Sequence, residues 1–302
     1  MSIEKCIICG CSETSVLVHL HSNNLIALKC KNCSHIYVNN SPINADNISE
    51  YYTMEDFKGK RTLQEFEYSN YYSDCFVDYN QKNESSLVLM QFKEKANYFD
   101  SLLPKGSKIL DVGCATGVFL DMMRKFEWEV EGVEVSNELA SYAHEKFNLK
   151  VHVRDITKEN LNSGPFQVIT MFDVIEHVVN PVEVIEAIHE HLNPGGIALI
   201  YTPNLESLAI HYLKEYSSSV IPVHHPFIFH KKSLCVGDSS TIDCKRMNVS
   251  PDVQFGVYFL NTPEPMNKSI EILRNKTSVF YYRNNGGFRT MDLVTKSGMH
   301  FV

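Results

Sequence analysis

The sequence has no apolar run that could cross a membrane. A spanning helix needs roughly 18 to 20 consecutive apolar residues, and no stretch of the 302 residues approaches that length. The segment from Met1 to Cys6 also lacks the basic-then-apolar pattern of a secretion signal. These absences predict a cytoplasmic protein without a membrane partner, and the length allows one large domain beside a small one.

An excess of positive charge is missing as well. The chain has 28 Lys and Arg against 36 Asp and Glu, a formal net charge of −8. Broad binding to a nucleic-acid backbone normally needs a basic surface. The charge balance therefore disfavours a nucleic-acid partner, without excluding a local basic patch. No internal repeat or low-complexity run is present either.

The nine cysteines cannot all pair in disulfides, because their number is odd. Four of them form two Cys-x-x-Cys turns: Cys6, Cys9, Cys30 and Cys33. Each turn can direct two thiolates at one ion, and four thiolates complete a tetrahedral zinc shell with no open position. The pattern predicts a small ribbon over residues 1–42, stabilised by a structural Zn²⁺. The alternatives are four inert thiols, or replacement of one ligand by a neighbour from the set Cys11, His19, His21 and His35.

The middle of the chain alternates short apolar runs with amphipathic segments. This pattern is typical of a parallel sheet covered by helices on both faces. The expected strands are 108–112, 129–135, 151–155, 166–172 and 197–201, and the expected helices are 118–126, 136–147 and 182–192. The tail is expected to form strands near 253–260, 278–282 and 288–294.

A glycine turn at 113–117 follows the first of these strands, and its composition separates two kinds of cofactor. A dinucleotide-binding turn would have glycine where this chain has Ala115 and Val118. Asp111 at the strand's end would repel a pyrophosphate but attract the cationic groups of S-adenosylmethionine. The turn therefore favours S-adenosylmethionine.

Two more acidic residues are expected at carboxyl ends of parallel strands, on the edge where open sheets bind ligands. Glu134 can accept hydrogen bonds from both ribose hydroxyls, and Asp155 can bind the adenine amino group. Either residue alone could instead cap a helix or lie in a solvated loop. Together and in order, the three acids predict a cofactor site.

At residues 109–117, 173–178 and 192–196 the sequence resembles the class I S-adenosylmethionine-dependent methyltransferases, and the last two motifs resemble the ubiquinone-biosynthesis branch. The resemblance spans about 87–204. It implies a doubly wound, Rossmann-like α/β fold with a mostly parallel, seven-stranded sheet and one antiparallel edge strand. Within 108–173 it points to cofactor contacts from Asp111, Gly113, Cys114, Gly117, Glu134, Val135, Asp155, Ile156, Phe172 and Asp173.

The fusion of the ribbon to a tyrosine-rich segment resembles bacterial methyltransferases of nucleotide-sugar and surface-polysaccharide biosynthesis. The resemblance implies that Tyr72 and Tyr79 cover the cofactor. A linker whose aromatic rings pack on the main domain is the alternative. The expected domains are the ribbon (1–42), an aromatic-rich helical linker or lid (43–86), the methyltransferase domain (87–235) and terminal strands (236–302) that complete the sheet or cover the acceptor.

Acceptor chemistry is expected from three residues. Glu176 and His177 follow the fourth strand of the domain, where a histidine oriented by a carboxylate can take a proton. His225 belongs to a histidine-rich segment that can bind the acceptor or act as base, although packing roles are the alternative for both histidines. A metal is not expected at His224 and His225, since adjacent side chains diverge.

The leading hypothesis is an enzyme that uses S-adenosylmethionine to methylate a small hydroxylated metabolite, such as a nucleotide-linked sugar. RNA methylation is one alternative, because some ribosomal RNA methyltransferases also carry an N-terminal zinc site. A non-catalytic module that senses cofactor and docks a partner is another. A homodimer formed through 236–302 is a further expectation.

Overall fold

The computed structural model forms two compact units. The first unit comprises 1–43, 173–185 and 197–302, and the second comprises 44–172 and 186–196. Within them the structure describes residues 5–20, 25–39, 41, 44, 47–52, 62–63, 66–67, 87–158, 161–203, 225–229, 233, 255–261, 279–284 and 287–292.

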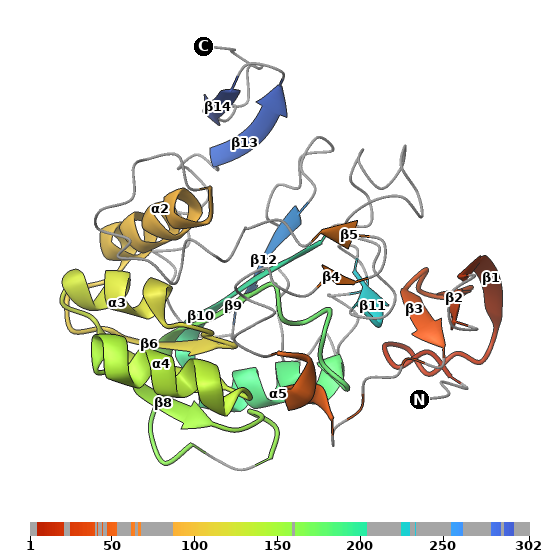
Figure 1. Ribbon diagram of the computed structural model, residues 1–302, viewed down its shortest axis with the longest axis horizontal. Coiled ribbons are helices and arrows are strands. Elements are labelled where there is room, and N and C mark those ends of the chain that lie inside the picture. Colours follow the sequence, from red (N-terminus) through yellow and green to blue (C-terminus); the bar gives the residue numbers. More distant parts are fainter. Residues whose placement is uncertain are drawn as a thin grey trace. The chain divides into compact units, whose positions relative to one another are not determined.

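Four parallel strands form the centre of the second unit, in the order β9-β6-β7-β8. Their bounds are β6 Lys108–Val112, β7 Glu129–Glu134, β8 Lys150–Val153 and β9 Phe166–Phe172. Helices α2 Leu87–Leu102, α3 Val118–Lys125 and α4 Asn137–Phe147 lie wholly within this unit. Helix α3 packs on β7, and α4 packs on β8 (Figure 1). A short helix and a hairpin complete the unit: η1 Ile48–Tyr51, β4 Thr62–Leu63 and β5 Phe66–Glu67.

The ends of α4 show why this segment forms a helix. The Ser136 hydroxyl accepts a hydrogen bond from the backbone N–H of Leu139 at 3.5 Å, which caps the N-terminus. Asn148 ends the helix in the left-handed conformation, with φ of 53°. Between these caps, Leu139, Ala140 and Ala143 are buried, so the helix presents one apolar face to the sheet.

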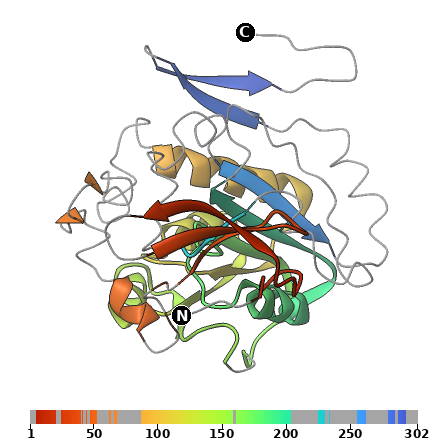
Figure 2. The same cartoon turned by 90° about the vertical axis from the view of Figure 1, so that its right-hand side faces the viewer.

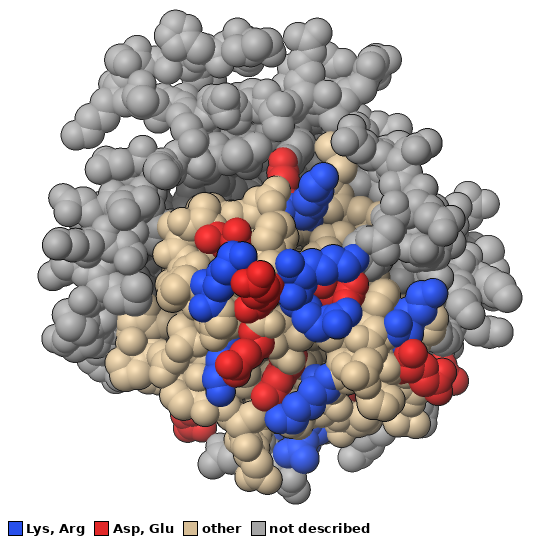
Figure 3. Space-filling model, turned by 90° about the vertical axis from the view of Figure 1, so that its left-hand side faces the viewer, with Lys and Arg blue, Asp and Glu red and all other residues tan. Residues whose placement is uncertain are grey.

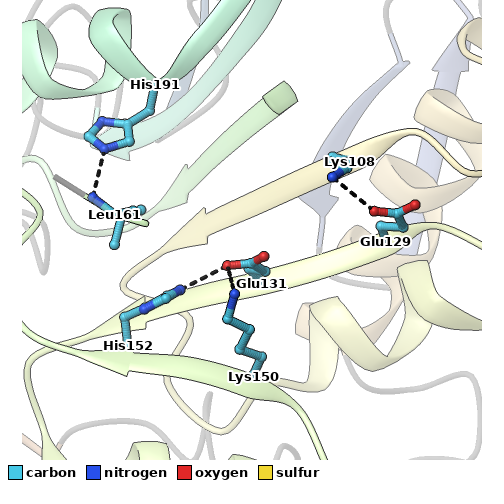
Figure 4. Close-up of polar contacts among 7 residues, drawn as sticks. All are labelled: Lys108, Glu129, Glu131, Lys150, His152, Leu161 and His191. Carbon is cyan, nitrogen blue, oxygen red and sulfur yellow. Dashed lines mark hydrogen bonds and ion pairs between the residues drawn. The ribbon is translucent and has the colours of Figure 1, made fainter. Parts of the chain in front are cut away.

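Polar contacts also link the strands of this unit (Figure 4). Glu131 on β7 accepts from His152 Nε2 at 2.8 Å and pairs with Lys150 Nζ at 3.0 Å on neighbouring β8. Lys108 and Glu129 form a similar pair at 3.2 Å between the starts of β6 and β7. These partly exposed ion pairs contribute little to stability. In each pair the positive and negative charges cancel.

The first unit is built from antiparallel strands. The strands β1 Thr14–Leu20, β2 Leu25–Cys30, β3 Ile36–Asn39 and β11 Phe227–Ile228 form one sheet in that order, with β1 and β2 side by side in Figure 2. Strand β12 Phe255–Asn261 pairs with β10 Leu192–Pro203, and β13 Val279–Asn284 forms a hairpin with β14 Gly287–Asp292. Helix α5 Pro181–His191 and strand β10 continue from one unit into the other.

The α/β class with parallel strands is confirmed, and the expected seven-stranded sheet stays a prediction. Most expected elements lie within a few residues of their predicted bounds. One expectation was wrong: the strand expected at 197–201 begins earlier, because β10 starts at Leu192 and includes residues 193–196. Gly195 has φ of 78° inside this strand, a conformation that glycine adopts without strain. No helix in the described part of the chain is long and apolar enough to span a membrane.

Strand β11 was not expected, and it changes the description of the ribbon. Phe227 and Ile228 pair with Tyr37 and Ile36 of β3, although the paired residues are 190 and 192 positions apart in the chain. The ribbon therefore shares its sheet with a segment that the sequence assigned to the methyltransferase domain. The predicted domain boundaries themselves stay predictions.

Candidate functional site

The glycine turn after β6 is held by backbone contacts within the second unit. Gly113 and Cys114 both donate their N–H groups to the carbonyl of Val133, at 2.7 and 3.1 Å. Gly113, Ala115 and Gly117 have φ of 74°, 48° and 78°, so the turn repeatedly enters the left-handed region. Ala115 therefore adopts a conformation that glycine favours.

Gly117 begins α3 at a point of close approach. A β-carbon added there would lie 2.5 Å from Leu149 Cδ1 and 3.0 Å from the Ala143 β-carbon. No side chain larger than hydrogen fits without a shift of the neighbouring chain. Glycine therefore brings the start of α3 against α4 and fixes the path of the turn.

Glu134 at the end of β7 ties this turn to the next loop. Its Oε2 accepts from the N–H of Ala115 at 2.9 Å, and its Oε1 accepts from the N–H of Ser136 at 2.8 Å. The residue is only 5% exposed, and burial raises the pKa of its carboxyl. A carboxylate has about four acceptor positions, so these two bonds leave capacity for a ligand hydroxyl.

Asp111 lies close to Glu134 and is also buried. Its Oδ1 accepts from the Thr170 hydroxyl at 2.7 Å, and the two residues are paired across β6 and β9. Burial raises the pKa of Asp111 to about 7, and the charge of Glu134 adds to the increase. Cys114, also buried, has its thiol pKa raised by burial and by the same two carboxylates. The structure thus gathers Asp111, Cys114 and Glu134 in an environment that a cationic ligand would stabilise.

Asp155 lies next to this group but already has a structural role. The backbone N–H of Arg154 bonds to the Glu134 carbonyl at 3.0 Å, which extends β8 beside the end of β7. The Asp155 Oδ1 accepts from both the N–H and the hydroxyl of Thr157, at 2.9 and 3.0 Å. Asp155 therefore caps a turn, and an adenine contact would have to use the second carboxylate oxygen. Val135 is half-buried and Ile156 is buried in the loops that follow β7 and β8.

Phe172, at the end of β9, packs against an aromatic cluster. Its ring centroid lies 4.9 Å from Phe119 and 5.6 Å from Phe92, and Lys95 Nζ lies 5.4 Å above its ring. The ring is half-buried, so part of its surface stays accessible. Sequence reasoning identified Phe172 but missed Phe92 and Lys95, which lie on α2 ahead of the first motif.

The acceptor candidates meet in the first unit. Glu176 is 1% exposed, and its Oε2 accepts from the Thr202 hydroxyl at 2.8 Å. His177 Nε2 lies 4.0 Å from Glu176 Oε1, and its ring meets that of His225 edge-on, with centroids 4.6 Å apart. Burial raises the pKa of Glu176 well above its ordinary value, and the charge of nearby Asp173 adds to this. Asp173 itself has φ of 54° and donates its N–H to the Tyr201 carbonyl at 2.8 Å.

The four ribbon cysteines also come together. Cys6 and Cys33 Sγ atoms are 3.6 Å apart, those of Cys9 and Cys30 are 3.5 Å apart, and all four lie within 4.8 Å of one another. Ligands about 2.3 Å from one tetrahedral ion are separated by about 3.8 Å, so the set fits Zn²⁺.

Four neighbouring residues could replace one of the cysteine ligands according to the sequence. Cys11 and His35 are not part of the cluster. The Cys11 sulfur instead accepts from the N–H of Glu13 at 3.4 Å. The buried His35 ring lies among Phe227, Phe229 and Tyr37. The side chain of His19, and His21 as a whole, lie outside the described residues, as do Tyr72 and Tyr79.

Known proteins resemble this chain mainly through its α/β region. Residues 88–236 match a protein family described as a methyltransferase domain. A ubiquinone biosynthesis O-methyltransferase of Shewanella halifaxensis is 28% identical over 167 residues, covering 50% of this chain and 70% of that protein. The corresponding enzyme of a Caulobacter species is 32% identical over 115 residues, covering 35% and 45%.

Solved structures show similarity at lower identity. A TehB-like S-adenosylmethionine-dependent methyltransferase from Corynebacterium glutamicum has a TM-score of 0.45 at 18% identity, covering 56% of this chain and 87% of that one. A sugar N-methyltransferase from a Streptoalloteichus species has a TM-score of 0.33 at 24% identity, covering 36% and 46%.

Proposed function

We propose that this chain, which is a class I S-adenosylmethionine-dependent methyltransferase, methylates a small hydroxylated metabolite. The acceptor class that we favour is a nucleotide-linked sugar or a related glycan precursor. The observation that carries the proposal is the buried group of Glu176, His177 and His225, which begins four residues after Phe172 in the chain. Hydroxyl acceptors need such polar groups, because a hydroxyl must lose its proton during methyl transfer.

The cofactor would be held by the carboxyl ends of the parallel strands. S-adenosylmethionine supplies an electrophilic methyl group on a sulfonium. Glu134, fixed by two backbone N–H groups, can accept from ribose hydroxyls. Asp111, buried beside it, can stabilise cationic charge, and Asp155 can bind the adenine amino group. Tyr72 and Tyr79 are proposed to cover the cofactor.

The protein's part in the reaction is to orient and deprotonate the acceptor. Methyl transfer is an in-line displacement, so the acceptor oxygen must be held on the axis of the breaking carbon–sulfur bond. Glu176 is fixed by Thr202, and the two histidine rings contact each other. We assign acceptor binding and proton removal to this group.

The ribbon and the charge distribution support a small acceptor. Zinc at Cys6, Cys9, Cys30 and Cys33 would be structural, because four protein ligands leave no position for substrate. Opposite charges are interspersed over the described part of the face in Figure 3, which offers no broad basic surface for a nucleic-acid backbone. The fused ribbon favours nucleotide-sugar chemistry through its resemblance to bacterial methyltransferases of that class.

The first experiment is calorimetric titration of the zinc-loaded protein with S-adenosylhomocysteine. We expect micromolar binding by the wild type, and weakening by about 10- to 100-fold in Glu134→Ala, because a hydrogen bond to a charged group contributes about 1.5–3 kcal/mol. Glu138→Ala, an exposed glutamate on α4, is the matched control and should bind like the wild type. Equal binding by Glu134→Ala would refute the ribose assignment.

The acceptor is then tested with nucleotide sugars and S-adenosylmethionine, with mass spectrometry of the products. A methylated sugar nucleotide supports the proposal. Transfer to RNA, with binding that weakens steeply as salt rises, would replace it. Cofactor binding without turnover on any acceptor pool would instead indicate a non-catalytic sensor.

A further inference from the structure

The first unit contains a second set of side chains that could hold a metal ion, separate from the cysteines. Glu176, His177 and His225 each offer one ligand atom, and these three atoms lie within 4.8 Å of one another. Glu176 and His225 are 1% and 9% exposed, and the His177 side chain is 14% exposed. Three potential ligands thus converge in a largely buried place, which distinguishes them from a chance cluster of surface acids.

The spacing of these atoms suits a shared ion better than direct contact. Glu176 Oε1 and His177 Nε2 are 4.0 Å apart, which is too long for a hydrogen bond. Two ligands that each lie about 2.1 Å from one ion can be up to about 4.2 Å apart. Small side-chain shifts would therefore bring all three atoms into coordination distance.

The surroundings fix the carboxylate in a ligand-like orientation. The buried Thr202 hydroxyl donates to Glu176 Oε2 at 2.8 Å. This bond leaves Oε1 on the side of His177. Metal-binding carboxylates are commonly held by such an outer hydrogen bond. In addition, the Glu176 carbonyl accepts from the N–H of Phe227 at 3.4 Å, which ties the site to the segment that carries His225.

We propose that Glu176, His177 and His225 bind a divalent cation whose remaining positions hold an oxygen of the acceptor. The proposal rests on the function proposed above and deepens it, because it assigns methyl transfer to oxygen. Two imidazoles and one carboxylate suit Mn²⁺, Co²⁺, Fe²⁺ or Zn²⁺, and three protein ligands leave positions open.

In this arrangement the group promotes proton removal through the cation, because both histidines are ligands and neither is the general base. The cation lowers the pKa of the bound hydroxyl, and the proton passes to water. The resulting oxygen forms the bond to the methyl carbon while the carbon–sulfur bond breaks, and its electrons stay on sulfur.

The site can be tested with Mn²⁺ alone as the probe. The full chain, loaded with one equivalent of Zn²⁺ to fill the four cysteines, is titrated with Mn²⁺, and the paramagnetic resonance signal of the free ion is recorded. Mn²⁺ is suitable because oxygen and nitrogen ligands hold it while thiolates favour zinc. We expect one Mn²⁺ per chain, at least tenfold weaker binding in His177→Ala and His225→Ala, and about tenfold weaker binding in Thr202→Val. His189→Ala, a half-buried histidine of α5 outside the cluster, should bind like the wild type.

Calorimetry with S-adenosylhomocysteine on the same samples separates the possible failures. If the wild type binds S-adenosylhomocysteine but no Mn²⁺ at millimolar concentration, the cation site is overturned and the methyltransferase function is not affected. Unchanged Mn²⁺ binding in both histidine variants overturns it as well. If either histidine variant is misfolded, Thr202→Val decides, because an unaltered Mn²⁺ affinity there contradicts the site. Loss of both ligands from the wild type would remove the proposed function too.

Discussion

Replacement of Gly117 by alanine tests the close contact at the start of α3. The residue has φ of 78°, and an added β-carbon would lie 2.5 Å from Leu149 Cδ1 and 3.0 Å from the Ala143 β-carbon. The left-handed conformation costs alanine about 1–2 kcal/mol, and overpacking costs about 1–3 kcal/mol more. We therefore expect Gly117→Ala to lower the free energy of unfolding by about 2–5 kcal/mol.

Gly106 provides a matched control for the overpacking cost in Gly117→Ala. It has the same φ of 78°, yet nothing lies within 4 Å of its added β-carbon. Gly106→Ala should therefore lose only the conformational part, about 1–2 kcal/mol. The effect of alanine on the entropy of the unfolded chain is similar in both variants, so it cancels in the difference.

Equilibrium unfolding in urea, followed by circular dichroism on zinc-saturated protein, gives both free energies. The expected difference between the two variants is about 1–3 kcal/mol, which equals the overpacking cost. Equal losses would show that α3 does not approach α4 and Leu149 as closely as in this structure. The explanation of Gly117 as a packing requirement would then be wrong.

Four further predictions concern the buried carboxylates and the ribbon. Burial raises the pKa of Asp111 to about 7, above about 3.9 in an unfolded chain, so its ionisation opposes folding. The ligand-free protein should therefore lose stability from about pH 4 to pH 7, and urea unfolding of Asp111→Asn should lack this contribution. S-adenosylhomocysteine, with its cationic amino group, should bind up to tenfold more weakly per pH unit below 7, and calorimetric affinities that do not change with pH would contradict this. Thr170→Val removes the hydrogen bond to Asp111 and should lower the free energy of unfolding by about 1–3 kcal/mol. Chelation of zinc should disorder β1, β2 and β3 and abolish Mn²⁺ binding at His225, and a chelated protein that still binds Mn²⁺ would show that the two sites are independent.

Local pattern was sufficient to predict most of the parallel strands. Each apolar run is short and follows an amphipathic segment, and such runs are buried wherever helices cover a sheet. The ends of the strands were less predictable: β8 is Lys150–Val153 rather than 151–155. Asp155 turns away to accept from Thr157 instead of continuing the strand. A side chain that competes for backbone N–H groups is difficult to distinguish from a ligand-binding residue by spacing alone.

The partners of the site residues depend on register, which the sequence does not display. Thr170 donates to Asp111 because β6 and β9 pair these residues directly, 59 positions apart. An ordered list of strands predicts that Asp111 lies at the binding edge. It does not predict which residue lies opposite, because a shift of one position would turn Thr170 to the other face.

The group of Glu176, His177 and His225 shows how a two-residue strand can bring candidate residues together. Sequence reasoning treated His177 and His225 as separate candidates and expected no metal near His225, since neighbouring side chains diverge. The structure brings His225 to Glu176 and His177 through β11, whose Phe227 pairs with β3 and donates to the Glu176 carbonyl.

The ribbon's sheet thereby supports the segment that carries His225. The N–H of Val38 on β3 donates to the Pro226 carbonyl at 2.8 Å, directly after His225 in the chain. Strand β3 in turn begins three residues after Cys33. Its backbone hydrogen bond to Pro226 and its pairing with β11 therefore connect the cysteines to the segment that carries His225. A small sheet with little core depends on its metal for rigidity. We therefore expect zinc bound at the cysteines to affect methyl transfer without contacting substrate, because it would fix the strand that supports the proposed acceptor-binding residues.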